Sequence, residues 1–296
     1  MSIWLIGARG MLGIDLGLVF HEFGIAFVGT GSEVDVRDQK ALEAFAGDQL
    51  DRGVEWIVNC SGYTAVDRAE DEPDLAFRLN VDGVENIARI ANALHARIVH
   101  ISSDYVFNGN QTRPYTEEDL PAPLGIYGRS KLEGERRLQA TTDRHYIVRT
   151  GWLYSSHGAN FLLSMLRQFR GRNKVRVVAD QRGSPTYARD LAIALLHIIG
   201  SGGEYYGTYN YTNSGDATWY DFANLIRDLG EKKGLIDPEV PIQPISTVEY
   251  PLRARRPAYS CLSKEKIRKV FGITPRPWQD ALDDCMERLR KQLCEG

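Results

Sequence analysis

A glycine-rich loop near the start of the chain restricts the fold more than any other stretch. Residues 3–6 (Ile-Trp-Leu-Ile) form a continuous apolar run, which is typical of a strand buried on both faces of a parallel sheet. Seven residues with glycine at every third position follow at once and lead into a helical pattern over residues 14–20. Such glycines let the backbone approach a pyrophosphate, which a helix N-terminus attracts. We therefore predict a nucleotide site at this loop, the alternative being a glycine-rich turn without a ligand. The predicted cofactor-binding residues of the loop are Gly7, Arg9, Gly10, Met11, Leu12 and Gly13.

The residues at the end of the second apolar run, which covers residues 25–30, bear on the choice of coenzyme. An Asp or Glu at the end of this strand commonly binds the ribose 2′-hydroxyl of NAD. Here the uncharged residues 30–32 (Thr-Gly-Ser) stand at that place, and Arg9 in the loop can attract a 2′-phosphate. The sequence therefore favours NADPH, while the nearby Glu33 leaves NADH open. Asp35 is placed to accept a hydrogen bond from an adenine amino group, with Val36 packing against the ring; the alternative for Asp35 is an ordinary loop acid.

Apolar runs and helical patterns alternate along the first half of the chain. Runs over residues 56–60, 97–101 and 145–150 each follow a helical stretch, with short connections. This alternation predicts an α/β fold with a doubly wound parallel sheet of the Rossmann type. Beyond residue 200, glycines and aromatic residues punctuate shorter elements, which indicates a smaller, partly interleaved α+β lobe. The predicted dinucleotide-binding domain covers residues 1–150 and roughly 185–200, and the substrate-binding lobe mainly residues 151–184 and 201–296.

Three side chains suited to carbonyl chemistry follow the strands of this predicted sheet. Ser103 comes just after the run 97–101, and Tyr127 lies four residues before Lys131 at the edge of a helical pattern. Four residues make about one helical turn, so Tyr127 and Lys131 share a face. We expect the ammonium group to lower the pKa of the phenol, Ser103 to hydrogen-bond a carbonyl oxygen, and Tyr127 to protonate that oxygen. A surface Tyr–Lys pair is the alternative, but ligands bind at the carboxyl ends of parallel strands, which favours catalysis.

The composition excludes several classes of function. The formal net charge of −3 gives no reason to expect nucleic acid as a partner. No apolar run approaches the roughly 20 residues that span a bilayer, so we expect a cytoplasmic protein without a membrane segment. The six histidines and four cysteines show no metal-site spacing, so the residues themselves predict no metal site.

These stretches together resemble one family of extended short-chain dehydrogenase/reductases, the dTDP-4-dehydrorhamnose reductase family. The resemblance covers nearly the whole chain, and its most specific part is Ser-Ser-Asp-Tyr-Val-Phe at residues 102–107, with serine at 103 where the family has threonine. The other matching stretches are residues 7–13, 58–59, 64–67, Asn80, 127–131 (Tyr-Gly-Arg-Ser-Lys), 149–154, 180–186 and 256–266.

The resemblance implies reduction of the C4 ketone of a dTDP-linked 6-deoxyhexulose with NAD(P)H, giving dTDP-L-rhamnose. It implies that Tyr127 is the acid, that Lys131 also holds the nicotinamide ribose, and that Ser103 orients the ketone. The sugar is expected to contact Trp152 and Asp104, and Arg182 is a candidate for the diphosphate, together with Arg253, Arg255 and Arg256. Beyond the loop, the residues expected to line the dinucleotide are Thr30, Asp35, Val36, Gly62, Tyr63, Thr64, Tyr127 and Lys131.

Some members of this family dimerise around a magnesium ion held by acidic residues. Asp15 and Asp190 lie near such positions, but no glutamate stands where a C-terminal ligand is expected. The resemblance therefore leaves Mg²⁺ open, and the acidic helical segments are compatible with a homodimer.

Two alternatives to this function remain open from the sequence. A related 4-keto reductase that makes a different nucleotide-deoxysugar would keep the same motifs, because pocket shape sets the product's stereochemistry. A non-catalytic regulatory subunit can also use this fold. The complete set of Ser103, Tyr127 and Lys131 argues against the regulatory role, since a regulatory subunit has no need of it.

Overall fold

The central element of the protein is a six-stranded parallel sheet. We describe a computed structural model that covers residues 2–50, 53–171, 174–236 and 240–295. The strands lie in the order β10-β5-β4-β3-β1-β2, and each neighbouring pair is parallel. Their bounds are β1 Ile3–Ile6, β2 Phe27–Thr30, β3 Trp56–Asn59, β4 Arg97–Ser103, β5 His145–Thr150 and β10 Gly207–Asn210. The predicted doubly wound sheet is confirmed.

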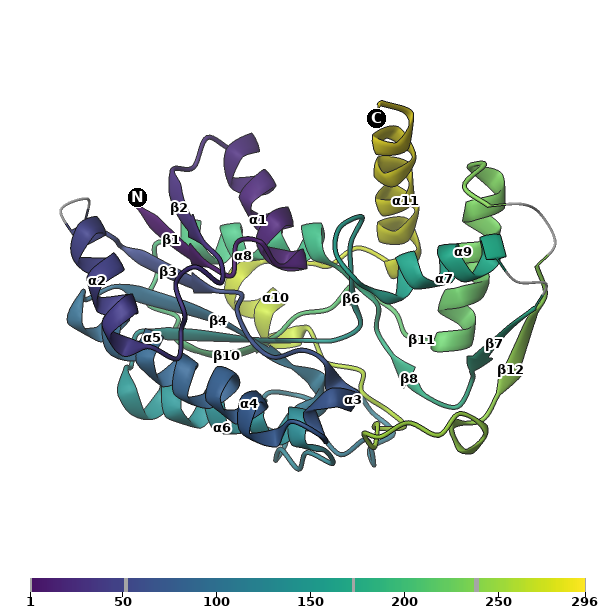
Figure 1. The fold of residues 1–296 in the computed structure, drawn as a ribbon, viewed down its shortest axis with the longest axis horizontal. Helices are drawn as coiled ribbons and strands as arrows, with labels where there is room; N and C mark the ends of the chain where they lie inside the picture. The colour runs from purple at the N-terminus through teal and green to yellow at the C-terminus, as the bar shows by residue number, and fades with distance from the viewer. Residues whose placement is uncertain (1, 51–52, 172–173, 237–239, 296) are drawn as a thin grey trace.

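Helices cover both faces of this sheet (Figure 1). One face carries α1 (Met11–Glu22), α8 (Ala188–Gly200) and α10 (Glu265–Phe271), whose apolar side chains share a core with the strands. The other face carries α2 (Gln39–Leu50), α5 (Gly83–Ala93) and α6 (Ile126–Thr141). Because both faces are covered, the strands read as continuous apolar runs: every residue of β1 and of β3 is buried.

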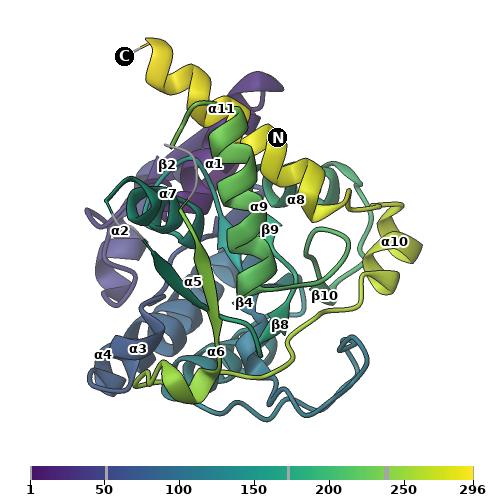
Figure 2. The same cartoon turned by 90° about the vertical axis from the view of Figure 1, so that its right-hand side faces the viewer.

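A second, smaller group of elements packs around a separate core, on the right of Figure 1 and facing the viewer in Figure 2. Its elements are β6 Leu153–Tyr154, α7 Phe161–Gly171, β7 Val175–Val178, β8 Arg182–Gly183, β9 Thr186–Tyr187, β11 Ala217–Thr218, α9 Trp219–Lys232, β12 Ile242–Ile245 and α11 Trp278–Glu295. The chain passes between the two groups more than once, since α8 and β10 belong to the main core. The expected interleaving of a small α+β lobe is thus observed.

The strand order reverses beside the glycine loop. The chain moves from β1 outward to β2 and then returns to β3 on the other side of β1. Ligands of open α/β sheets bind where the order reverses in this way, outside the carboxyl ends of the strands. The loop after β1, the segment after β3 and the end of β4 all open onto this edge.

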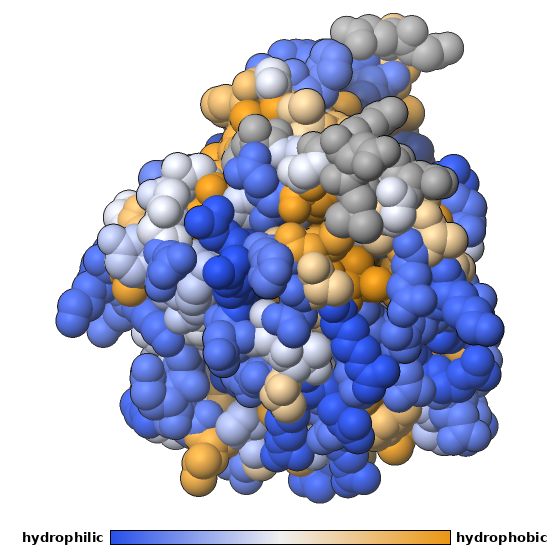
Figure 3. All heavy atoms as spheres, turned by 90° about the vertical axis from the view of Figure 1, so that its left-hand side faces the viewer, coloured by the Kyte–Doolittle hydropathy of each residue, from blue (hydrophilic) through white to orange (hydrophobic). Residues whose placement is uncertain are grey.

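Short helical segments lie between β3 and α5, namely α3 (Val66–Ala69), α4 (Pro73–Phe77) and η1 (Arg78–Asp82), the last a turn of π-helix. The surface at the α2 end of the molecule is mainly hydrophilic, with small hydrophobic patches (Figure 3). Among the described residues, no helix combines the length and apolar character needed to cross a membrane.

Candidate active site

Ser103, Tyr127 and Lys131 come together where β4 ends against α6. Ser103 is the last residue of β4, and α6 begins at Ile126, so Tyr127 lies in its first turn and Lys131 in its second. The Ser103 hydroxyl accepts a hydrogen bond from the Tyr105 N–H (3.1 Å) and donates one to Asp104 Oδ1 (3.1 Å). It also hydrogen-bonds the Tyr127 phenol. The hydroxyl and the phenol are therefore adjacent, as the sequence predicts.

The pKa of Tyr127 moves in the direction opposite to the one we expected. Burial raises the pKa of the phenol to about 12, and its hydrogen bond with Ser103 offsets only part of that rise. The expected lowering by Lys131 is wrong because the ammonium group turns toward the sheet, where it donates to the Ile101 carbonyl (2.6 Å). The phenol is therefore held in its protonated form, which is the form a proton donor needs.

Lys131 is nearly inaccessible, with 5% of its surface exposed. Burial lowers the pKa of its ammonium group to about 8, while Glu135 and Cys60 raise it in part. The Lys131 Nζ also lies 3.5 Å from Nε2 of His100, a histidine buried within β4. Sequence reasoning overlooked His100, because a buried strand residue carries no signal of proximity to a helix 31 residues away.

The glycine loop forms a close-fitting cradle before α1. The backbone N–H groups of Gly7 and Ala8 both donate to the Thr30 carbonyl (2.8 and 2.9 Å). A Cβ on Gly13 would lie 2.1 Å from the Gly7 carbonyl oxygen, so only glycine fits there. Gly10 precedes the first turn of α1 and has no side chain to cap it. The first-turn N–H groups therefore suit a pyrophosphate, and the loop fits a dinucleotide.

Thr30, Asp35 and Val36, also predicted to line the dinucleotide, each contact a different part of the protein. Thr30 turns its hydroxyl into the core, where it accepts from Trp4 Nε1 (3.0 Å), so it supports the loop through its carbonyl. Asp35 forms an ion pair with Arg37 (2.6 Å), which lowers the pKa of its carboxyl group. Val36 is buried in the core between the sheet and α5.

The segment after β3 approaches Lys131 through Gly62. A Cβ on Gly62 would lie 2.8 Å from Asn80 Oδ1 and 3.8 Å from Lys131 Nζ. Asn80 accepts from the Tyr63 N–H (2.8 Å) and donates to the hydroxyl of Ser130 (2.9 Å). It thereby ties this segment to α6, whereas the neighbouring Thr64 is exposed.

Besides Ser103, three residues predicted to bind the substrate lie along the junction with the second lobe. Asp104 is buried beside Ser103, and burial raises the pKa of its carboxyl group to about 7. Trp152 has a backbone φ of +48°, unusual for a residue with a side chain, and its ring stacks on Trp219 with centroids 3.5 Å apart. Arg182 is half exposed and forms an ion pair with Asp216.

Residues 253–256 form a strap that leads from the second lobe to the main domain near Tyr127. Asp67 accepts from the Ala254 N–H (3.1 Å) and pairs with Arg256 (2.8 Å). Arg253 lies 3.3 Å from Asp71. Two of the arginines proposed for the diphosphate therefore anchor the strap, and Arg255 remains exposed between them.

The comparisons with known proteins agree with this geometry. Residues 1–291 match the protein family described as RmlD substrate binding domain. A dTDP-4-dehydrorhamnose reductase of Aggregatibacter actinomycetemcomitans is 38% identical, over 94% of this chain and 96% of that protein. The chain belongs to the dTDP-4-dehydrorhamnose reductase family. The family resemblance that we noted in the sequence is confirmed.

Two solved structures of dTDP-4-dehydrorhamnose reductases share the whole fold. The one from Clostridium acetobutylicum has a TM-score of 0.90 at 34% identity, covering 98% of this chain and 100% of that one. The one from Bacillus anthracis, in complex with NADP, also has a TM-score of 0.90, at 32% identity, covering 97% and 99% of the two chains.

The two acidic residues that the family resemblance associates with magnesium, Asp15 and Asp190, accept hydrogen bonds from other side chains of this chain. Both oxygens of Asp190 accept hydrogen bonds from Arg276 (2.7 and 2.8 Å), and Oδ2 also accepts from Asn213. Asp15 is buried and accepts from the Ser155 hydroxyl. Within the described part of the chain, no three His, Cys, Asp or Glu side chains are grouped to hold a metal ion.

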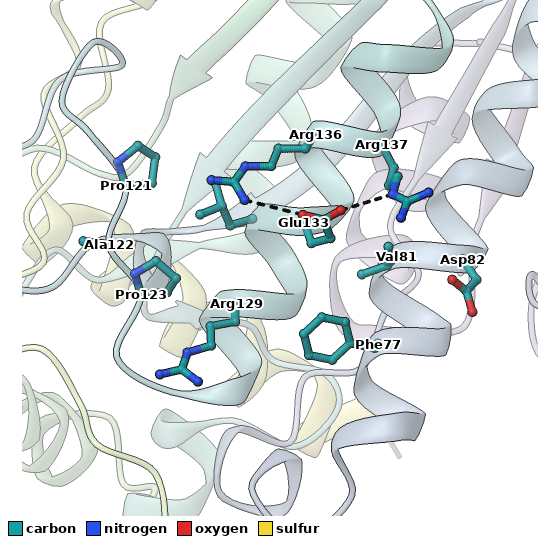
Figure 4. A pocket seen from close by; sticks show the side chains of 11 residues that line it. Phe77, Val81, Asp82, Pro121, Ala122, Pro123, Arg129, Glu133, Arg136 and Arg137 are labelled. Carbon is teal, nitrogen blue, oxygen red and sulfur yellow. Dashed lines mark hydrogen bonds and ion pairs between the residues drawn. The ribbon is translucent and has the colours of Figure 1, made fainter.

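A groove of about 690 Å³ on the outer side of α6 is separate from this site (Figure 4). Phe77 and two prolines line it, and Glu133 lies between Arg136 (3.5 Å) and Arg137 (3.1 Å) at its rim. Neither Ser103, Tyr127 nor Lys131 contributes to its lining. Because these three residues do not line the groove, it is not the candidate active site despite its size.

Proposed function

We propose that this protein reduces the C4 ketone of a dTDP-linked 6-deoxyhexulose with a nicotinamide coenzyme and forms dTDP-L-rhamnose. The observation that carries the proposal is the adjacency of Ser103 and Tyr127, with Lys131 one turn away, at the edge that bears the glycine loop. The family membership of residues 1–291 supplies the substrate class.

Each of these side chains has a separate role in the proposed ketone reduction. The bound coenzyme supplies a hydride, and the protein supplies position and a proton. Tyr127 gives that proton to the carbonyl oxygen, since burial keeps its phenol protonated at neutral pH. Ser103 holds the same oxygen through its hydroxyl. We assign Asp104 and Trp152 to the sugar and Arg182 to the diphosphate, because all three lie where the two lobes meet.

The direct test is oxidation of NADPH by the purified protein with dTDP-4-dehydro-L-rhamnose. We expect turnover that depends on the keto sugar, and NMR of the product should show dTDP-L-rhamnose. A different C4 epimer would identify the related 4-keto reductase. Lack of turnover with any dTDP-4-keto-6-deoxyhexose, together with a stable co-purifying enzyme, would support the regulatory subunit instead.

We further propose NADPH as the preferred coenzyme, with weak discrimination against NADH. Arg9 lies at the mouth of the loop with its guanidinium 3.4 Å from Glu33, and both side chains are exposed. Glu33 also accepts a hydrogen bond from the Gly31 N–H (2.7 Å) at the end of β2. A 2′-phosphate at this place would meet one attractive and one repulsive charge.

Opposite substitutions of this pair should move the coenzyme preference in opposite directions. An exposed ionic contact contributes up to about 1 kcal/mol, so Arg9→Ala should lower the NADPH:NADH ratio of kcat/KM by about fivefold, and Glu33→Gln should raise it by a similar factor. Arg89→Ala removes another exposed arginine, on α5, and should leave the ratio unchanged. Equal ratios in all three variants would show that this pair does not contact the 2′-position.

A further inference from the structure

A buried histidine lies between two polar side chains under the active site. His100 is in β4 and has no exposed surface. Its Nδ1 is 3.1 Å from Asn59 Nδ2, at the end of β3, and its Nε2 is 3.5 Å from Lys131 Nζ, on α6. Both ring nitrogens therefore have a polar neighbour, and the position of the ring proton affects Lys131.

The neighbours of Asn59 determine where that proton lies. Asn59 Oδ1 accepts from the backbone N–H of Ser61 (2.9 Å) and from its hydroxyl (2.6 Å). A backbone N–H can only donate, so the amide oxygen must face Ser61 and the NH₂ group must face His100. An NH₂ group also only donates, so Nδ1 of His100 is the acceptor. Burial lowers the pKa of His100 well below its usual range, so the ring is neutral and carries its proton on Nε2.

The Nε2–H of His100 consequently faces Lys131 as a donor. An ammonium group has three N–H donors and no acceptor. One of them reaches the Ile101 carbonyl (2.6 Å). The His100 ring cannot accept a second N–H of this ammonium group, although its Nε2 lies 3.5 Å from Nζ.

The other groups around Lys131 do not replace that acceptor. Burial raises the pKa of the Cys60 thiol to about 12, so Cys60 is uncharged at neutral pH. Glu135, one turn further along α6, directs both carboxylate oxygens to Arg149 (2.9 and 2.6 Å). Two ammonium hydrogens of Lys131 thus remain without an acceptor in the described part of the protein.

We propose that His100 is a positioning residue for Lys131: by offering a donor in place of an acceptor, it leaves two ammonium hydrogens for hydroxyl groups of the bound coenzyme. This inference rests on the proposed function, which assigns Lys131 to the coenzyme. The same donor also disfavours the charged lysine and acts in the same direction as burial, which lowers the pKa of Lys131 to about 8. Loss of the lysine proton should then produce an alkaline limb in the pH profile of kcat/KM for the coenzyme.

The variant Asn59→Asp tests the arrangement by reversing the tautomer. A carboxylate only accepts, so it draws the ring proton to Nδ1 and turns Nε2 into an acceptor for Lys131. The acceptor stabilises the ammonium form and raises the pKa of the lysine. We expect the alkaline limb to move up by about one to two pH units, since a hydrogen bond to a charged group is worth that much. We also expect KM for the coenzyme to rise severalfold, with a smaller change in kcat, because the ammonium group of Lys131 is drawn toward His100 and away from the coenzyme.

Two measurements that need no turnover separate this inference from the proposed function. Long-range ¹H–¹⁵N spectra of histidine-labelled protein should show the His100 proton on Nε2 in the wild type and on Nδ1 in Asn59→Asp. The titration of the Lys131 ε-carbon, followed by ¹³C NMR, should move upward in the variant. His145→Gln replaces another buried histidine, whose Nδ1 contacts the Thr142 carbonyl, and should leave both the lysine titration and the alkaline limb in place.

A wild-type spectrum with the proton on Nδ1 would overturn the inference, and it decides the matter even where Asn59→Asp does not fold. A switched tautomer with an unmoved lysine titration would overturn it as well. If the protein proves not to be a reductase, the tautomer and the lysine titration still test the role of His100.

Discussion

Replacing Tyr127 with phenylalanine is expected to lower kcat by about 10²- to 10⁴-fold, the range that a positioned proton donor contributes. The substitution removes only the phenolic oxygen next to the Ser103 hydroxyl and leaves the ring in place at the start of α6. Because the lost group acts on the carbonyl oxygen as hydride arrives, KM for the coenzyme should change little. Steady-state kinetics with NADPH and the keto sugar measure both quantities.

The neighbouring tyrosine provides a matched control. The ring of Tyr105 contacts the ring of Tyr127 edge to face, with centroids 5.9 Å apart, and it too is a phenol in a buried setting. Tyr105→Phe should keep kcat within about tenfold of wild type, whereas loss of the catalytic donor should lower it by at least about 10²-fold. Near-wild-type kcat for Tyr127→Phe, with an intact fold by circular dichroism, would remove Tyr127 from the role of acid.

The second large effect concerns stability. Substituting Glu135 with glutamine should lower the free energy of unfolding by about 3–5 kcal/mol, because it leaves a buried guanidinium without its counter-charge. Arg149, at the end of β5, donates to Glu135 through both Nε (2.9 Å) and Nη2 (2.6 Å), and the two side chains are only 6% and 2% exposed. The guanidinium also lies over the ring of Phe107. Urea denaturation measures the change.

Two further variants identify the source of this loss. The double variant Glu135→Leu/Arg149→Met removes both charges, so it should recover much of the stability that the single variant loses. Glu133→Gln breaks an exposed pair with Arg137 on the same helix and should cost less than about 1 kcal/mol. A loss below about 1 kcal/mol for Glu135→Gln would show that water reaches Arg149 in solution.

The parts of the active site that sequence reasoning identified are encoded over short distances along the chain. The glycine loop directly follows β1, and Tyr127 and Lys131 are separated by one helical turn. Ser103 was placed by the expectation that parallel strands end at a common edge, which the sheet order confirms. The assignment of these residues to catalysis stays a prediction until the variants are measured.

Contacts between distant segments were beyond the sequence. Asp67 pairs with Arg256, 189 positions away, and Trp152 stacks on Trp219 from another element. A charge or an aromatic ring does not specify its partner, so the sequence did not predict these contacts. The division of the chain into two domains also stays a prediction. Within residues 201–296, assigned mainly to the substrate-binding lobe, β10 and α10 pack with the main core instead.

The sequence alone determined the class of fold and the family and predicted the reactive groups, because periodicity and short spacings are properties of neighbouring residues. Only the tertiary structure decided the protonation states of those groups. Burial raises the pKa of Tyr127 and lowers that of Lys131, and the amide of Asn59 orients the ring of His100. Desolvation and hydrogen-bond direction depend on what surrounds a side chain in space, and chain spacing does not encode that.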